Sequence, residues 1–132
     1  MLSLLFDQHI STEIAEQIRA KRPEISIVGL YEWRQGAFVG TADPVILRAA
    51  AGEGLTLVTY DRKTIPQVLI EWGAVKISHG GVVFVDDVTI ASNEFGRLVR
   101  GLIHFWDQEH TKDWTDRIGF LPAPPQQRIG AM

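Results

Sequence analysis

The chain has 132 residues, of which 45% are hydrophobic and 22% charged, with 13 basic and 16 acidic side chains and no cysteine. This composition is typical of one soluble domain whose core needs no disulfide or structural metal. Without cysteine there is no disulfide framework, thiolate zinc site or cysteine nucleophile, and the cytoplasm is the expected compartment. The net charge of −3 argues against nucleic-acid binding by bulk positive charge.

The apolar start of the chain, Leu2 to Phe6, is interrupted by Asp7. It is shorter than a membrane span of about 18 residues, and no basic segment precedes it as in a signal peptide. We therefore expect a first strand there and no membrane association.

Short β-branched or apolar runs alternate along the chain with segments of helical periodicity. The runs predict strands over residues 2–6, 25–28, 55–59 and 82–85, with a further short strand at 74–77. Helices are predicted from Ser11 or Thr12 to just before Pro23, from the start signal Thr41–Pro44 to Gly52, from Thr64 to Trp72, and from Ala91 or Ser92 to about Glu109. Residues 30–38 are expected to be a loop with a turn of helix, and the segment up to Leu121 to add an edge strand or a packing arm.

Strands separated by helices predict a three-layer α/β/α fold with a mostly parallel central sheet. Residues 1–121 are expected to form a single domain and residues 122–132 a frayed, flexible C-terminal tail. The last helix carries a long apolar stripe, which we expect to be buried in the core or in a homodimer seam. The stripe consists of Phe95, Leu98, Val99, Leu102 and Trp106.

Aspartates follow three of the predicted strands, at Asp7, Asp61 and Asp86 with Asp87, and a fourth, Asp43, opens a helix. In a parallel sheet these side chains converge beyond the carboxyl ends of the strands, where their charges repel and raise one another's pKa. A hard divalent cation, Mg²⁺ or Mn²⁺, would compensate that repulsion. Aspartate is also a common turn former and helix cap. Either Thr41 or Asp43 could cap the second predicted helix, and a capping role would by itself explain Asp43.

Three segments occur in an order that resembles the small PIN-like proteins related to VapC-type toxins: Leu4–Asp7, Thr41–Ala50 and Leu57–Asp61. The likeness runs from the first strand to about Ile65, and more loosely to the strand at 82–85 and the last helix. It implies a PIN-like domain that cuts RNA with Mg²⁺ or Mn²⁺, as the toxin of a toxin-antitoxin pair whose partner is an antitoxin protein. It also implies that Asp7, Asp43 and Asp61 hold the cation, that the Thr59 hydroxyl orients them, and that a fourth metal ligand comes from Asp86 or Asp87.

Two departures from the family pattern leave other functions open. The residue after Asp7 is commonly acidic in this subfamily, whereas here it is Gln8, followed by His9. Arg62, Lys63 and Thr64 stand where an acidic-aromatic pair is usual, which makes this margin more basic. One alternative is an inactive PIN-like module that binds protein or RNA. A less favoured one is a receiver-type signalling domain, which would need an acidic pair after the first strand and a lysine after a late strand.

The remaining polar and aromatic residues carry weaker signals. Phosphate contacts are expected from among Arg34, Arg48, Arg62 and Lys63, and base stacking from among Tyr31, Trp33 and Tyr60. Solvated charges and a core position for Trp33 are the plainer explanations. The four histidines, His9, His79, His104 and His110, match no zinc spacing, and the sequence has neither a serine-hydrolase elbow nor a glycine-rich phosphate loop.

Overall fold

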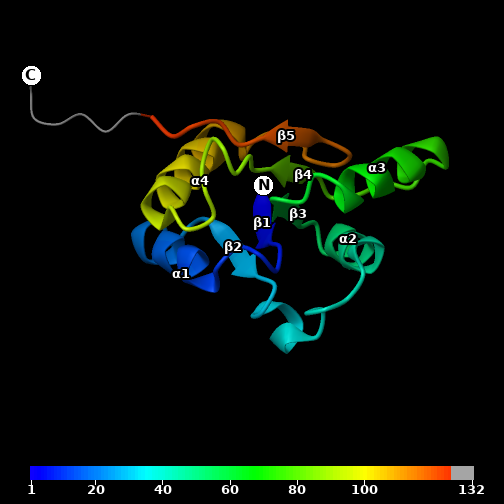
Figure 1. The fold of residues 1–132 in the computed structure, drawn as a ribbon, viewed down its shortest axis with the longest axis horizontal. Coiled ribbons are helices and arrows are strands. Elements are labelled where there is room, and N and C mark those ends of the chain that lie inside the picture. Colours follow the sequence, from blue (N-terminus) through cyan, green and yellow to red (C-terminus); the bar gives the residue numbers. More distant parts are fainter. Residues whose placement is uncertain (126–132) are drawn as a thin grey trace, which may run out of the picture.

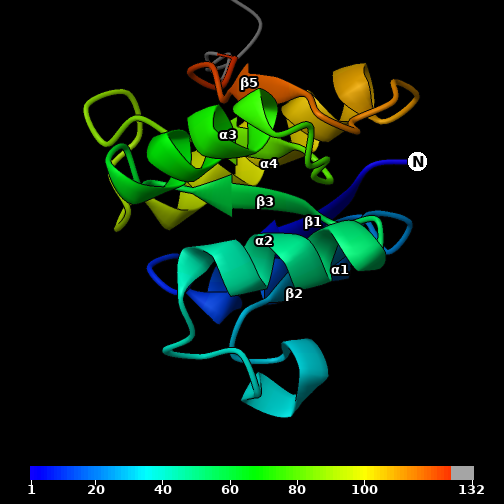
Figure 2. The same ribbon diagram turned by 90° about the vertical axis from the view of Figure 1, so that its right-hand side faces the viewer.

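A computed structural model describes residues 1–125 of the chain. Five strands form one parallel sheet in the order β2-β1-β3-β4-β5, and helices cover both of its faces (Figures 1 and 2). The strands are β1 (Ser3–Phe6), β2 (Ser26–Gly29), β3 (Thr56–Thr59), β4 (Val82–Phe84) and β5 (Ile118–Phe120). The helices are α1 (Thr12–Lys21), α2 (Asp43–Gly52), α3 (Thr64–Ala74) and α4 (Phe95–Glu109), with a 3₁₀ turn η1 (Trp33–Gly36). The predicted three-layer α/β/α fold with a parallel sheet is confirmed.

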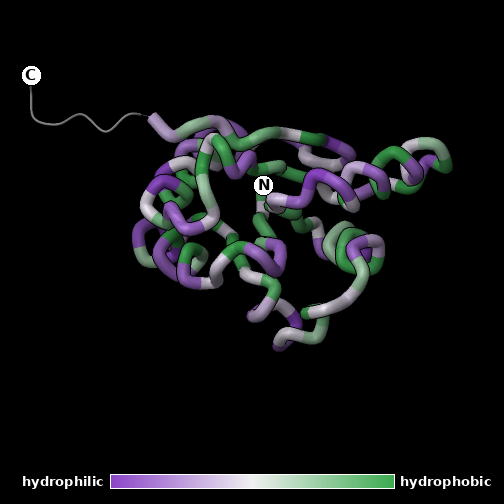
Figure 3. The backbone as a smooth tube through the Cα atoms, in the orientation of Figure 1, coloured by the Kyte–Doolittle hydropathy of each residue, from purple (hydrophilic) through white to green (hydrophobic). Residues whose placement is uncertain are grey.

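The central strands are buried because helices pack on both sides of the sheet. Alternate residues point to opposite faces, so Leu4 and Phe6 of β1 join a core with α1 and α4, while Leu5 joins a second core with α2 and α3. The tube in Figure 3 shows hydrophobic segments along the strands and mixed segments along the helices. This two-sided burial explains why the strands read as continuous apolar runs rather than alternating ones.

Strands β1 and β3 lie side by side at the point where the direction of strand addition reverses. From there β2 extends the sheet on one side, and β4 and β5 extend it on the other. Phe6 pairs with Val58, so both strands end at the same level of the sheet. A doubly wound sheet binds ligands in the crevice beyond the carboxyl ends of the strands at this reversal point. The residues after β1 and β3 therefore occupy the position where the fold offers a ligand site.

Of the four α-helices in residues 1–125, only α1 has an N-cap residue whose side chain makes a capping hydrogen bond. Ser11 caps α1 as predicted, because its Oγ accepts a hydrogen bond from the backbone N–H of Glu13. The capping of α2 by Thr41 or Asp43 was a wrong prediction, since Ala42 occupies the N-cap position and no side chain caps the helix. Pro44 in the first turn has no N–H to satisfy. The Asp43 carboxylate is therefore not used by its own helix.

The strand predicted at residues 74–77 is absent, because the chain closes α3 there with a Schellman turn. The N–H of Ile77 donates to the carbonyl of Trp72, the N–H of Lys76 donates to that of Gly73, and Lys76 adopts a left-handed φ of 60°. Ile77 packs against the core of α2 and α3. Ile77 is hydrophobic because it packs at this helix end. The same β-branched pattern also occurs in strands, so the sequence does not distinguish the two.

Helix α4 begins at Phe95, three or four residues later than the sequence predicted, because residues 86–94 form turns. The Oδ1 atom of Asp86 accepts the N–H of Val88, and Oε1 of Glu94 accepts that of Ala91. The apolar stripe of α4 is buried in the core of this chain, as expected, with Phe95 half-buried at its start. Of the two alternatives for that stripe, the core rather than a homodimer seam accounts for its burial.

The predicted edge strand near the end of the chain is present as β5, which pairs with β4. Residues 122–125 continue from it without regular secondary structure. The rest of the predicted tail, residues 126–132, lies outside the described residues. None of the helices in residues 1–125 is both long enough and apolar enough to cross a membrane.

Candidate functional site

Thr59 joins the two aspartates that follow β1 and β3. Its side chain is fully buried at the end of β3, and its hydroxyl donates a hydrogen bond of 2.6 Å to Oδ2 of Asp7. The same oxygen accepts the backbone N–H of Asp61 at 3.0 Å. Asp7 and Asp61 therefore lie together at the carboxyl edge of the sheet, where the strand pattern predicted them.

Asp43 brings a third carboxylate to this edge from the first turn of α2. The pKa of Asp43 is raised, first by its partial burial and then by the negative charges of Asp7 and Asp61, with a hydrogen bond to Asp61 adding to the effect. His9 opposes the shift with its positive charge when protonated. We define Asp7, Asp43 and Asp61 as the aspartate cluster. Its members come from three separate segments, and the charges of Asp7 and Asp61 add to the effect of burial on Asp43.

Asp61 also forms the start of α3. Its Oδ1 accepts the backbone N–H groups of Lys63 at 2.7 Å and Thr64 at 2.8 Å. These bonds satisfy amides at the helix start that have no partner within the helix. One oxygen of Asp61 is thus structural, and its second oxygen is available to the aspartate cluster.

Asp86, the predicted fourth ligand, is held elsewhere by its own turn. Its Oδ1 accepts the N–H of Val88, and its Oδ2 is 2.9 Å from the Arg62 guanidinium. The pKa of Asp86 is lowered mainly by the Val88 hydrogen bond and further by the charge of Arg62. Asp87 is exposed and lines a surface hollow together with Asp61. Of this pair, Asp87 shares a hollow with a member of the cluster, whereas both oxygens of Asp86 are engaged in the turn and the ion pair.

A hollow of about 420 Å³ lies beside the aspartate cluster, and we call it the polar hollow. Asp61 belongs to both. Three of its lining residues carry basic side chains, and the hollow opens at the start of α3. It is lined by His9, Tyr60, Asp61, Arg62, Lys63, Thr64 and Asp87.

Gln8, the residue after Asp7, has a structural contact. Its side-chain oxygen accepts the backbone N–H of Gly40 at 3.1 Å and so ties the end of β1 to the loop before α2. The backbone N–H of Gln8 donates to Oδ1 of Asp7 at 2.7 Å. The loop that leads into Asp43 is thus anchored beside Asp7 by a neutral side chain.

The four basic residues expected to contact phosphate differ in their surroundings. Arg34 pairs with Glu53 at 2.7 Å, Arg62 pairs with Asp86, and the Arg48 guanidinium lies 5.7 Å from the centre of the Trp72 ring. Among residues 1–125, no carboxylate forms an ion pair with Lys63. Lys63 therefore lines the polar hollow, and its ammonium group has no ion-pair partner among the described residues.

The aromatic candidates for base stacking separate into core and surface. Trp33 is buried, stacks on Phe38 and donates from Nε1 to Glu53, so its core interpretation holds. Tyr60 lines the polar hollow, but its hydroxyl donates to the Ile90 carbonyl and burial raises its pKa to about 12. Tyr31 is exposed. Tyr60 is thus held in a fixed position at the hollow.

His79 precedes the Gly80–Gly81 turn, where the sequence favours a turn residue over a ligand contact. The structure buries it at the opposite edge of the sheet, before β4. Its Nδ1 accepts the N–H of Gly81 at 3.0 Å, and its own backbone N–H donates to Asp116. Ser78 also donates to Asp116. Because Asp116 lies 37 residues away in the chain, no local spacing identifies this contact.

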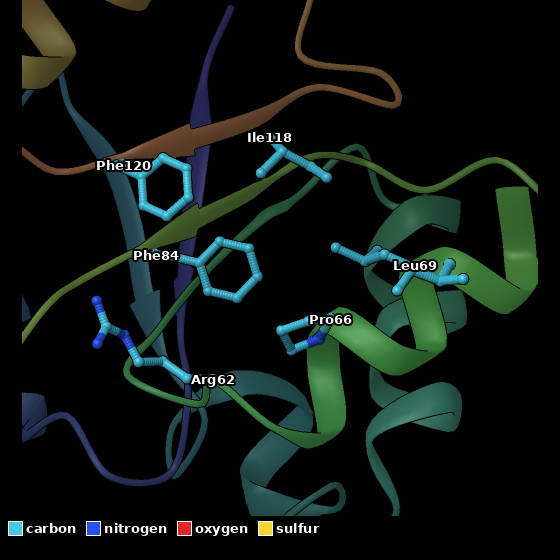
Figure 4. Close-up of a pocket in the computed structure, with 7 residues that line it drawn as sticks. Arg62, Pro66, Leu69, Phe84, Ile118 and Phe120 are labelled. Carbon is cyan, nitrogen blue, oxygen red and sulfur yellow. The ribbon is translucent and has the colours of Figure 1, made fainter.

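A second hollow, of about 460 Å³, lies between α3 and the strands β4 and β5. Figure 4 shows Phe84 and Phe120 on the strand side, Pro66 and Leu69 on α3, and Arg62 at one end. Its walls are apolar apart from Arg62, so it offers no set of converging polar groups for chemistry. The chemistry-bearing residues of the described chain gather instead at the aspartate cluster.

Comparison of the chain with protein-family models, with curated proteins and with solved structures finds no match.

Proposed function

We propose that this chain is a PIN-like, Mg²⁺- or Mn²⁺-dependent endoribonuclease that hydrolyses RNA phosphodiester bonds in the cytoplasm. The observation that supports the proposal is the aspartate cluster, in which Asp7, Asp43 and Asp61 from three segments lie close enough to raise the pKa of Asp43. Asp43 is not explained as a helix cap, because Ala42 holds that position. Asp43 thus adds a third carboxylate to this edge without a capping role, and a bound divalent cation would offset the resulting repulsion.

The donor set fits a hard divalent cation through its chemistry, since carboxylate oxygens are the ligands that Mg²⁺ and Mn²⁺ prefer. Within residues 1–125, no group of three or more His, Asp or Glu side chains is arranged to hold an ion by itself. Mg²⁺ commonly uses one or two carboxylates and keeps several waters. Asp43 and the second oxygen of Asp61 are the groups with capacity for direct contact, and Asp7 supports them through Thr59.

The bound cation would supply Lewis-acid activation of water and neutralise charge on the phosphoryl oxygens. The chain's own residues have positioning roles. Thr59 holds the Asp7 carboxylate and the Asp61 backbone in one fixed geometry. Asp61 in turn fixes the start of α3, which carries Lys63 at the edge of the polar hollow. Such pre-positioned groups lower the cost of orienting substrate and water at the reacting bond.

The test is cleavage of a mixed RNA pool by the full-length protein with Mg²⁺, with Mn²⁺ and with EDTA. We expect cutting only with metal, and we expect Asp7→Asn, Asp43→Asn and Asp61→Asn each to abolish it, because an amide keeps the shape but not the charge. Glu16→Gln, at an exposed carboxylate on α1, is the matched control and should cut as the natural chain does. Cleavage that persists in EDTA, or in all three variants, would contradict the proposal.

Gln8 favours a second candidate, an inactive PIN-like module that binds protein or RNA. Its neutral side chain holds the Gly40 loop and adds no carboxylate beside Asp7. Thermal melts with Mg²⁺ or Mn²⁺ separate the two candidates, because a ligand that binds the folded state raises its melting temperature. A nuclease should show a shift that Asp43→Asn abolishes, whereas an inactive module should show none.

The toxin role follows from the resemblance alone, and an antitoxin protein is its proposed partner. Expression of the chain in bacteria tests that role, since a toxin arrests growth and Asp61→Asn should relieve the arrest. The receiver-type alternative has the matching strand order, but residues 85–94 and 121–125, which follow β4 and β5, contain no lysine. The receiver-type function is therefore less well supported than the endoribonuclease or the inactive module.

A further inference from the structure

We infer that the polar hollow binds one phosphate group of a single-stranded RNA, and that Lys63 is the side chain that holds it. The inference rests on the proposed function, and it names the part of the substrate that lies next to the bond to be cut. Asp61 is shared by the aspartate cluster and the hollow. A strand whose scissile phosphate lies at the cluster therefore places a neighbouring nucleotide in the hollow.

The charge balance of the region singles out Lys63. The aspartate cluster repels phosphate, so a substrate needs a positive group close by that is not already neutralised. Arg62 lines the same hollow but is paired with Asp86, Arg34 is paired with Glu53, and Arg48 lies over Trp72. Within the described residues, Lys63 is exposed and has no ion-pair partner. A phosphate can therefore bind Lys63 without breaking an existing ion pair, which is not so for Arg62.

The backbone at the start of α3 does not compete for this role. Helix starts often bind phosphate through their N–H groups, but here the N–H groups of Lys63 and Thr64 donate to Asp61. The phosphate must then be held by side chains. Lys63 carries a compact charge on a flexible stem, which suits a phosphate contact that makes no demand on base identity.

The size and wall of the hollow favour a single strand over a duplex. A volume of about 420 Å³ is in the range of small-ligand pockets and accepts one nucleotide rather than a paired segment. Tyr60 is an aromatic residue of this wall and is fixed there by its hydrogen bond to the Ile90 carbonyl. Recognition of single-stranded RNA commonly combines such a ring with a basic side chain.

The experiment is fluorescence anisotropy of a labelled single-stranded RNA with the full-length protein in EDTA, over a range of salt concentrations. Omitting the metal keeps binding separate from cleavage. A strand that binds in EDTA but is not cut when Mg²⁺ or Mn²⁺ is then added would defeat the nuclease proposal and leave this one standing. We expect Lys63→Ala to weaken binding several-fold and to reduce the slope of log affinity against log salt by about 0.7, the effect of losing one contact to a single strand. Lys63→Arg should restore both.

Lys21→Ala is the matched control, because Lys21 is an exposed lysine in the last turn of α1. Helix α1 begins after β1 at the carboxyl edge of the sheet and ends before β2, which starts at the opposite edge, so its last turn lies away from the hollow. This variant should bind as the natural chain does. Equal binding by Lys63→Ala and Lys21→Ala, or no binding of RNA by the natural chain, would overturn the inference. A duplex bound as tightly as the single strand would overturn its single-strand part.

Discussion

Thr59 is the buried residue on which the position of two aspartates depends. Its hydroxyl donates to Asp7 in a buried hydrogen bond and accepts from the Asp61 backbone in a partly buried one. Buried hydrogen bonds cost more when broken than they contribute when formed, because the remaining partner is left without water. Thr59 is thus a residue of the site and of the fold at the same time.

Replacing Thr59 by valine should therefore destabilise the protein although the two side chains have the same shape. The change leaves the Asp61 N–H and an Asp7 oxygen unpaired, and we expect a loss of about 1–3 kcal/mol in the free energy of unfolding. Urea denaturation measures it. Thr59→Ser keeps the hydroxyl and should lose clearly less, so an equal loss in both variants would show that the methyl group and not the hydroxyl is responsible.

Asp43→Asn should stabilise the metal-free protein near neutral pH. A raised pKa in the folded state means that this carboxyl favours folding when protonated and opposes it once pH rises through the raised pKa. The amide removes that opposition. Thermal melts should show a higher melting temperature for the variant near pH 7, and the difference should shrink as pH approaches the ordinary aspartate pKa of about 3.9. A variant that melts lower at neutral pH would contradict the repulsion argument.

At the scale of elements, the turn between α3 and β4 depends on Gly81. This residue has a φ of +100°, and a Cβ atom there would lie 2.5 Å from the Trp114 carbonyl oxygen. That oxygen belongs to the backbone, which cannot move aside as a flexible side chain does. The tight packing of residues 79–81 against the loop before β5 thus leaves no room for a side chain.

Gly81→Ala should cost about 2 kcal/mol or more, from the left-handed φ and the clash together. Gly52→Ala is the matched control, because nothing lies within 4 Å of its Cβ position and the residue is helical. There alanine should be neutral or stabilise the protein by up to about 1 kcal/mol. Chemical denaturation of both variants checks the pair, and similar effects at the two positions would refute the explanation.

The sequence predicted most elements because their signals are local. Buried strands, the Ser11 cap and the stripe of α4 each follow from residues a few positions apart. The errors arose where one residue type suits two structures. The β-branched pair Val75 and Ile77 belongs to a helix end rather than a strand, and the start signal of α2 uses Ala42 instead of a polar cap.

The candidate site could be predicted in part for the same reason. Asp7 and Asp61 follow strands, so a parallel sheet necessarily brings them to one edge, and the Thr59 contact follows from that geometry. The engagement of Asp86 with Arg62 and the tie between Gln8 and Gly40 are contacts between separate segments. No spacing along the chain encodes such pairs, which depend on the register of the finished sheet.

For the whole molecule, His79 and Asp43 should shape the dependence of stability on pH in opposite directions. The pKa of His79 is lowered by burial, although Asp116 opposes the shift. Below the ordinary histidine pKa of about 6.5, His79 is therefore protonated in the unfolded chain while it is still neutral in the folded chain. The free energy of unfolding falls as pH decreases through this range. Protonation would also oppose the bond in which Nδ1 accepts the Gly81 N–H.

We expect His79→Asn to lose stability less steeply between pH 6.5 and the lowered pKa, because an amide oxygen can accept the Gly81 N–H without titrating. Denaturation curves at a series of pH values, for the natural chain and the variant, measure the slope. The same slope in both proteins would show that other groups govern this part of the profile.

The place of β1 in the sheet has a consequence for protein synthesis. Strand β1 is synthesised before the other strands of this sheet but lies between β2 and β3, and Leu2 is held by hydrogen bonds with Trp106 and His110. A nascent chain cannot complete this packing before α4 has been translated. The apolar residues of β1 therefore remain exposed, or bound by chaperones, until α4 packs over them. Slow translation of the second half would therefore lengthen the time during which this protein is vulnerable to aggregation.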